Sequence, residues 1–188
     1  MSQLNSVLPQ IASSCTDMWE HFPTLRHLAS QCESVVEMGV RGGCSAYALA
    51  AGLEMSKAKE KWMIYVDINP CKNAKLEELC EQAGINISFH QTDSRLIEIP
   101  PTDLLFIDTL HTYGQLTTEL GMHQGNAKKY IVCHDTEAPW GFRNEADDGS
   151  PNLGLKQAIE DFLEVYKDKW QQYAHYPNCH GLTVLARI

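Results

Sequence analysis

The chain has 188 residues, of which 44% are hydrophobic, and its formal net charge is −9 at pH 7. This length and apolar content suit one globular domain spanning residues 1–188. The acidic balance argues against a nucleic-acid partner or an anionic membrane surface. No apolar run approaches the roughly twenty residues of a membrane-spanning helix, and the N-terminal residues lack the pattern of a secretory signal.

Seven cysteines are spread along the chain without a C-x-x-C pair. This usage favours reduced thiols and therefore a cytoplasmic location. Cys44 and Cys133 have apolar neighbours, so we expect both to fill space in the core.

Residues 1–33 are expected to form a helical cover, because apolar residues recur at helical spacing and Pro23 can open a second helix. Strands are expected at 34–38, 62–66, 85–90, 103–108 and 129–133, and helices at 45–55, 71–83, 113–124 and 155–166. This alternation predicts an α/β core over residues 34–188, with a doubly wound, mostly parallel sheet. Strands at 170–176 and 181–186 would add a C-terminal antiparallel hairpin.

The stretch 35–45 combines a buried strand, a glycine turn and the start of a helix. Such a junction can bind a polar or anionic ligand through free backbone N–H groups. The glycines do not follow the G-x-G-x-x-G spacing of dinucleotide sites, and Glu37 would repel a pyrophosphate. A carboxylate at that position instead suits a ligand with a positively charged amine. An ordinary strand-to-helix turn is the plainer alternative.

Five acidic residues stand at or just after the C-terminal ends of predicted strands: Glu37, Asp67, Asp93, Asp108 and Asp135. Ligands of open α/β sheets bind at that edge. Carboxylates gathered there repel one another unless a cationic ligand, ribose hydroxyls or a divalent metal compensates them. Helix capping is the alternative for any one of them, and for Asp93 above all.

The order of these residues resembles the class I S-adenosylmethionine-dependent methyltransferases, whose Rossmann-like fold would cover nearly the whole chain. The cofactor motif reads Glu37-x-Gly39-x-x-x-Gly43-x-Ser45, followed by Asp67. The segments D-x-x-H-x-Y at 108–113, H-D-T at 134–136 and G-L-T-V-L at 181–185 resemble a small group often labelled type 24. Thr109 and the segment 125–129 depart from that group, which usually has glycines there.

The resemblance implies a binding site for S-adenosylmethionine. The backbone at Gly39, Val40 and Gly43 and the Ser45 hydroxyl would hold the methionine part, with Glu37 near its amine. Asp67 would hold the ribose, with Ile68 beside it. Asp93 and Ser94 would lie beside the adenine, and Asp108 would also contact the cofactor.

The resemblance further implies O-methylation of a small molecule. Asp108 and Asp135 are placed to bind a hard divalent ion such as Mg²⁺ through oxygen. We hypothesise that His111 is the general base. His134 would be catalytic as an acceptor contact, a metal ligand or a supporting residue. Helix capping by His111 and simple packing of His134 are the alternatives.

Two other functions stay open from the sequence. One is a non-catalytic module that binds S-adenosylmethionine, and the other is a nicotinamide-dependent oxidoreductase on a Rossmann sheet. The polar loop at 137–152, with Trp140, Phe142 and Arg143, is expected to shape the acceptor pocket. The sequence also leaves a homo-oligomer open.

Overall fold

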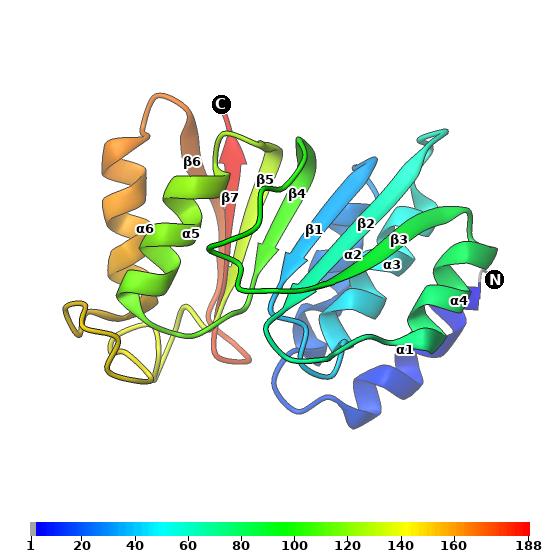
Figure 1. Cartoon of the computed structure of the whole chain (residues 1–188), viewed down its shortest axis with the longest axis horizontal. Helices are drawn as coiled ribbons and strands as arrows, with labels where there is room; N and C mark the ends of the chain where they lie inside the picture. The colour runs from blue at the N-terminus through cyan, green and yellow to red at the C-terminus, as the bar shows by residue number, and fades with distance from the viewer. Residues whose placement is uncertain (1–2) are drawn as a thin grey trace.

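The computed structural model describes residues 3–188, which fold around a seven-stranded sheet (Figure 1). The strands are β1 (Ser34–Met38), β2 (Lys61–Asp67), β3 (Ile85–Gln91), β4 (Thr102–Ile107), β5 (Ala127–His134), β6 (Trp170–Tyr176) and β7 (Leu182–Arg187). They lie in the order β3-β2-β1-β4-β5-β7-β6. Strands β1 to β5 are parallel, and β7 is antiparallel to both β5 and β6. The predicted parallel sheet with a C-terminal hairpin is therefore confirmed.

Helices cover both faces of the sheet, so the molecule has three layers (Figure 1). The helices are α1 (Gln3–Ser14), α2 (Phe22–Ala29), α3 (Cys44–Met55), α4 (Ala74–Gln82), α5 (Tyr113–His123) and α6 (Gly154–Val165), with a 3-10 turn η1 (Trp19–His21). Successive strand residues point to opposite faces of the sheet and so belong to different helix layers. Val35 packs with α1 to α4, whereas Val36 packs with α5 and α6. No helix within residues 3–188 is long and apolar enough to cross a membrane.

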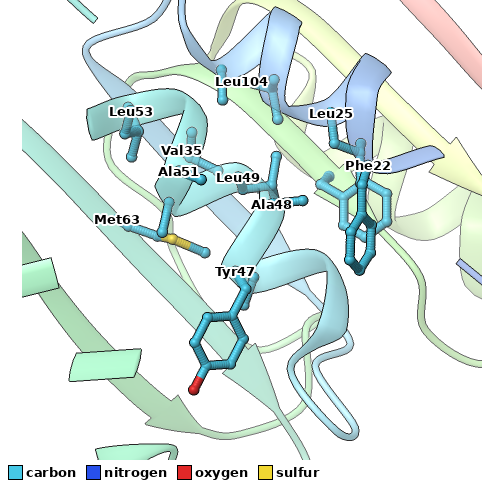
Figure 2. Packing of buried hydrophobic residues seen from close by; sticks show 14 of the residues in the cluster. Phe22, Leu25, Val35, Tyr47, Ala48, Leu49, Ala51, Leu53, Met63 and Leu104 are labelled. Carbon is cyan, nitrogen blue, oxygen red and sulfur yellow. The ribbon is translucent and has the colours of Figure 1, made fainter. Parts of the chain in front are cut away.

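Helix α3 is the most deeply buried helix, and Figure 2 shows the apolar side chains around it. Phe22 and Leu25 of α2 belong to the same cluster as Leu49 of α3. A Cβ at Gly52 would lie 2.4 Å from the carbonyl oxygen of Arg26, so glycine permits the close approach of α2 and α3. This packing fixes the start of α3, which follows the glycine turn.

Some predicted boundaries differ from the structure. Helix α4 begins at Ala74 rather than near residue 71, because the Asn73 side chain accepts a hydrogen bond from the Leu76 N–H (3.0 Å) and caps the helix. The N-terminal cover is broken between α1 and η1. Cys133 is buried as expected, whereas Cys44 at the first position of α3 is only half-buried.

The direction in which successive strands are added to the sheet reverses between β1 and β4, which are neighbours in space but not in sequence. Connections from β1 run one way to β2 and β3, and those from β4 run the other way to β5. The carboxyl end of such a switch point is where α/β proteins bind ligands. The fold therefore opens its crevice beside Gly39 and Asp108.

Candidate active site

A cavity of about 830 Å³ lies at the carboxyl edge of the parallel strands. This volume is in the range of small-molecule sites, about 300–1,000 Å³. Of the predicted site residues, the following line it: Gly39, Asp67, Ile68, Asp93, Ser94, Asp108, His111 and Asp135. The acids of four different strand ends thus meet around one space.

The remaining predicted residues lie around this cavity. Val40 and Ser45 line a smaller neighbouring pocket of about 240 Å³, which also reaches Asp108. Glu37, Gly43 and His134 line neither space. Glu37 and His134 are both buried.

Gly39 is the tightest point of the site. Its N–H donates to the Val66 carbonyl (2.9 Å), and its φ of 84° lies in the left-handed region. A Cβ at this position would lie 1.8 Å from the carbonyl oxygen of Asp108. Only glycine lets the end of β1 and the end of β4 come this close.

Asp67 holds the glycine turn in place through backbone hydrogen bonds. Its Oδ2 accepts from the N–H groups of Val40 (2.9 Å) and Arg41 (3.0 Å), and its Oδ1 accepts from that of Asn69 (2.8 Å). Burial raises the pKa of Asp67, but these bonds outweigh burial and the pKa is lowered. A carboxylate has about four acceptor positions, so an ionised Asp67 can still accept from a ligand hydroxyl in the cavity.

Glu37 is fully buried at the end of β1. Its Oε1 accepts a short hydrogen bond from the Ser45 hydroxyl, and its Oε2 has no partner among the described residues. Burial raises the pKa of Glu37 to about 8, the bond from Ser45 opposes this, and the negative charges of Asp108 and Asp67 add to it. A buried carboxyl oxygen without a donor is unusual, and the raised pKa favours a protonated, uncharged carboxyl group at this position.

His111 lies between two carboxylates. Its Nε2 is 3.2 Å from Asp108 Oδ1 and 3.1 Å from Asp135 Oδ2, while its Nδ1 is 2.9 Å from Glu145 Oε2. One ligating atom each from Asp108, His111 and Asp135 lie within 4.8 Å of one another. Two carboxylate oxygens and an imidazole nitrogen form a donor set that suits a divalent metal.

The charges of this cluster depend on one another. Burial lowers the pKa of His111, but hydrogen bonds and the negative charges of Asp108 and Asp135 outweigh it and raise the pKa to about 10. The pKa of Asp135 is lowered in turn, since hydrogen bonds from His111 and His134 outweigh its burial. The two acids therefore hold a positive charge between them, as a protonated imidazole or a bound cation.

His134 supports the cluster from behind. Its Nδ1 is 3.0 Å from Asp135 Oδ2, and its Nε2 is 2.9 Å from the Cys179 carbonyl oxygen in the hairpin turn. The ring of His21 meets it edge-on at 5.5 Å between centroids. Because His134 is buried and does not line the cavity, its geometry fits the supporting role among those expected for it.

The loop at 137–152 closes one side of the cavity, as expected, through Trp140 and Glu145. The rings of His111 and Trp140 are stacked, with 6.3 Å between centroids and 13° between planes. The Arg143 guanidinium lies 5.4 Å from the Trp140 ring centroid. Phe142 is exposed and is not part of the lining.

The segments after β3 and β4, together with α5, contribute a network of polar side chains beside the cavity. Asp93 is paired with Arg95 (2.7 Å). Glu119 of α5 is fully buried and accepts from the hydroxyl of Thr109 (2.9 Å), the amide of Gln115 (2.7 Å) and the hydroxyl of Ser94. The departure from glycine at Thr109 thus supplies one of the donors.

Sequence reasoning did not assign several residues of the site, among them Arg41, Gln115, Glu119 and Glu145. Glu119 lies between Leu116 and Leu120, which are both buried in α5, and an acid on an apolar helix face was a signal for a buried network. Arg41 belongs to the glycine turn but has a φ of 45° and pairs with Asp17 (2.6 Å). That contact joins distant segments, so no local pattern could predict it.

The chain matches no family of known sequences and no curated protein. It does match solved structures. An O-methyltransferase from Bacillus cereus in complex with SAH matches with a TM-score of 0.61 and 15% identity, over 98% of this chain and 90% of that one. The O-methyltransferase TomG from Streptomyces achromogenes, in complex with SAM, matches with a TM-score of 0.63 and 14% identity, over 100% and 90% of the chains.

A third match carries out a different transfer. The N-methyltransferase NodS from Bradyrhizobium japonicum, in complex with SAH, has a TM-score of 0.60 and 14% identity, over 99% of both chains. These likenesses show that the chain has the Rossmann-like fold of class I methyltransferases, as the motifs implied. The resemblance to the smaller type 24 group stays a prediction.

Proposed function

We propose that this protein is an S-adenosylmethionine-dependent methyltransferase that transfers a methyl group to the hydroxyl of a small molecule. One observation carries the proposal: the cavity at the switch point of this fold brings Gly39, Asp67, Asp108 and Asp135 together. The acids suit a sulfonium cation, and the likeness to SAM- and SAH-bound structures supports the same cofactor class. Residues 1–188 would form one catalytic domain, in which residues 1–33 cover the α/β core of residues 34–188.

The parts of the cofactor would be held by different residues. The backbone at Gly39, Val40 and Gly43, with the Ser45 hydroxyl, would hold the methionine part. Glu37 would support the amine end through the Ser45 hydroxyl, because its own oxygens are buried and line neither cavity. Asp67, with Ile68 beside it, would accept from the ribose hydroxyls. Ser94 would lie beside the adenine, and Asp108 near the sulfonium.

The cluster Asp108, His111 and Asp135 would hold a divalent ion such as Mg²⁺. A histidine that binds a metal usually donates its other N–H to a carboxylate, and Glu145 Oε2 lies 2.9 Å from His111 Nδ1, close enough for that role although the two atoms are not aligned as a hydrogen bond here. When bound, the ion would lower the pKa of an acceptor hydroxyl and orient it. This contact favours a ligand role for His111 over the general-base role that the sequence analysis predicted.

In the reaction, the acceptor oxygen attacks the methyl carbon, the bond between carbon and sulfur breaks, and the hydroxyl proton leaves to solvent. The products are a methyl ether and S-adenosylhomocysteine. The chain contributes alignment, since Asp67 and Gly39 fix the donor side while Trp140 and His111 bound the acceptor side. His134 would act as a positioning residue behind Asp135.

Calorimetry with S-adenosylmethionine and its demethylated product tests the proposal. Wild-type protein should bind both, and Glu37→Gln and Asp67→Asn should each weaken binding about tenfold or more. Asp168→Asn, at an exposed position after α6, should leave binding unchanged. Absence of binding by the wild type, or unchanged binding by both site variants, would overturn the proposal. Binding without turnover across a panel of phenols and alcohols would favour the non-catalytic alternative.

A further inference from the structure

The end of the cavity formed after β3 and β4 is built on one buried carboxylate. Ser94, Thr109 and Gln115 all line the cavity, and all three direct a donor to Glu119. The backbone carbonyl of Ser94 is fixed as well, 2.9 Å from Nε2 of the buried His123. Such a connected network holds its members in one arrangement.

The network decides which way the Gln115 amide points. Its Nε2 lies 2.7 Å from Glu119 Oε1 and 3.1 Å from Ser94 Oγ. Burial raises the pKa of Glu119, but both of its oxygens already accept hydrogen bonds from hydroxyl groups, those of Ser94 and Thr109. The reverse orientation would place the amide oxygen of Gln115 against the acceptor Glu119 Oε1, and two acceptors repel each other. The amide nitrogen therefore faces Glu119, and Oε1 takes the other side of the amide.

That oxygen is available to a ligand. No described residue donates to Gln115 Oε1, although Gln115 is largely buried and lines the cavity. Asp93 is a competing acceptor at this end, but the Arg95 side chain engages both of its oxygens, at 3.1 and 2.7 Å. Gln115 Oε1 is therefore the acceptor at this end of the cavity that is held in a fixed direction.

We propose that Gln115 determines the specificity for the nucleoside base, an inference that rests on the proposed function. Its Oε1 accepts a hydrogen bond from the exocyclic amine of adenine, and Glu119 is the positioning residue that fixes the amide. Hypoxanthine has a carbonyl where adenine has the amine. Two oxygens would then face each other, so the site selects an adenine nucleoside over its deaminated form.

Calorimetry with S-adenosylhomocysteine and S-inosylhomocysteine tests this inference. Wild-type protein should bind the inosine compound about tenfold to a hundredfold more weakly, because one hydrogen bond is lost and a buried acceptor is left unpaired. Gln115→Met keeps the length of the side chain without its amide and should reduce the difference to about threefold or less. Gln171→Met, at an exposed position of β6, is the matched control and should keep the wild-type preference.

Glu119→Gln provides a second variant that leaves the Gln115 side chain in place. The neutral amide at 119 accepts either orientation of Gln115, so the preference for adenine should again decrease. Thermal melting shows whether each variant is folded before binding is compared. Equal affinity of the wild type for both compounds, or an unchanged preference in either folded variant, overturns the inference. If the wild type binds neither compound, the proposed function itself fails, and this inference with it.

Discussion

Gly39 offers the sharpest test of how the site is built, through the single substitution Gly39→Ala. A non-glycine residue in the left-handed region costs about 1–2 kcal/mol, and Gly39 has a φ of 84°. The added Cβ would also lie 1.8 Å from the Asp108 carbonyl oxygen and 2.4 Å from its carbon, which are backbone atoms. Relieving such overpacking costs about 1–3 kcal/mol more. We therefore expect the free energy of unfolding to fall by about 2–5 kcal/mol.

Two other glycines separate these contributions. Gly84 has a φ of 68° but nothing within 4 Å of an added Cβ, so Gly84→Ala should show the conformational cost alone. Gly121 lies inside α5, where an added Cβ also meets nothing within 4 Å. Gly121→Ala should therefore stabilise the protein by about 0.5–1 kcal/mol.

Urea unfolding of the three variants, followed by circular dichroism, measures these differences. The gap between Gly39→Ala and Gly84→Ala isolates the clash with the end of β4. If Gly39→Ala loses no more stability than Gly84→Ala, the close packing of β1 against Asp108 is refuted. Weaker cofactor binding by a folded Gly39→Ala protein would connect this contact to the proposed site.

Three further outcomes follow from the buried polar groups. Because burial raises the pKa of Glu37 to about 8 from an ordinary 4.5, native protein keeps a proton that the unfolded chain releases. Glu37 should thus make the free energy of unfolding fall between about pH 4.5 and 8, and Glu37→Gln should flatten that fall in urea titrations; parallel wild-type and variant curves would refute this. Asp135→Asn should weaken Mg²⁺ or Mn²⁺ binding at least about tenfold in calorimetry, and unchanged affinity would contradict the metal site. Thr109→Val removes a donor to Glu119 (2.9 Å) and should cost about 1–3 kcal/mol in urea unfolding, whereas wild-type stability would show that the bond contributes nothing.

The sequence was informative where local patterns decide structure. Apolar strands alternate with helices along the sequence, and this alternation predicts the parallel sheet and its carboxyl edge correctly. The acids at the ends of β2 to β5 lie at one cavity because parallel strands end on the same side. The place of Gly39 after β1 predicts that it belongs to the site, and Gly39 does line the cavity.

Long-range contacts could not be predicted in this way. Asp67 looked like a free ribose acceptor, yet its first partners are the N–H groups of Val40 and Arg41, on a turn that precedes it by more than twenty residues. His134 is the last residue of β5, but its ring turns away from the cavity towards the Cys179 carbonyl. The direction of a side chain depends on tertiary neighbours, and no local spacing encodes them.

The strand order has a consequence for how this chain must reach its native state. β5 ends at His134, and the partner along its outer edge is β7, which follows a long loop, α6 and β6. Until Leu182–Arg187 emerges from the ribosome and inserts between β5 and β6, the apolar edge of β5 has its N–H and C=O groups unpaired. A nascent or truncated chain that lacks this segment therefore exposes an unpaired edge strand that can pair with other chains. We expect chaperones to bind at this edge.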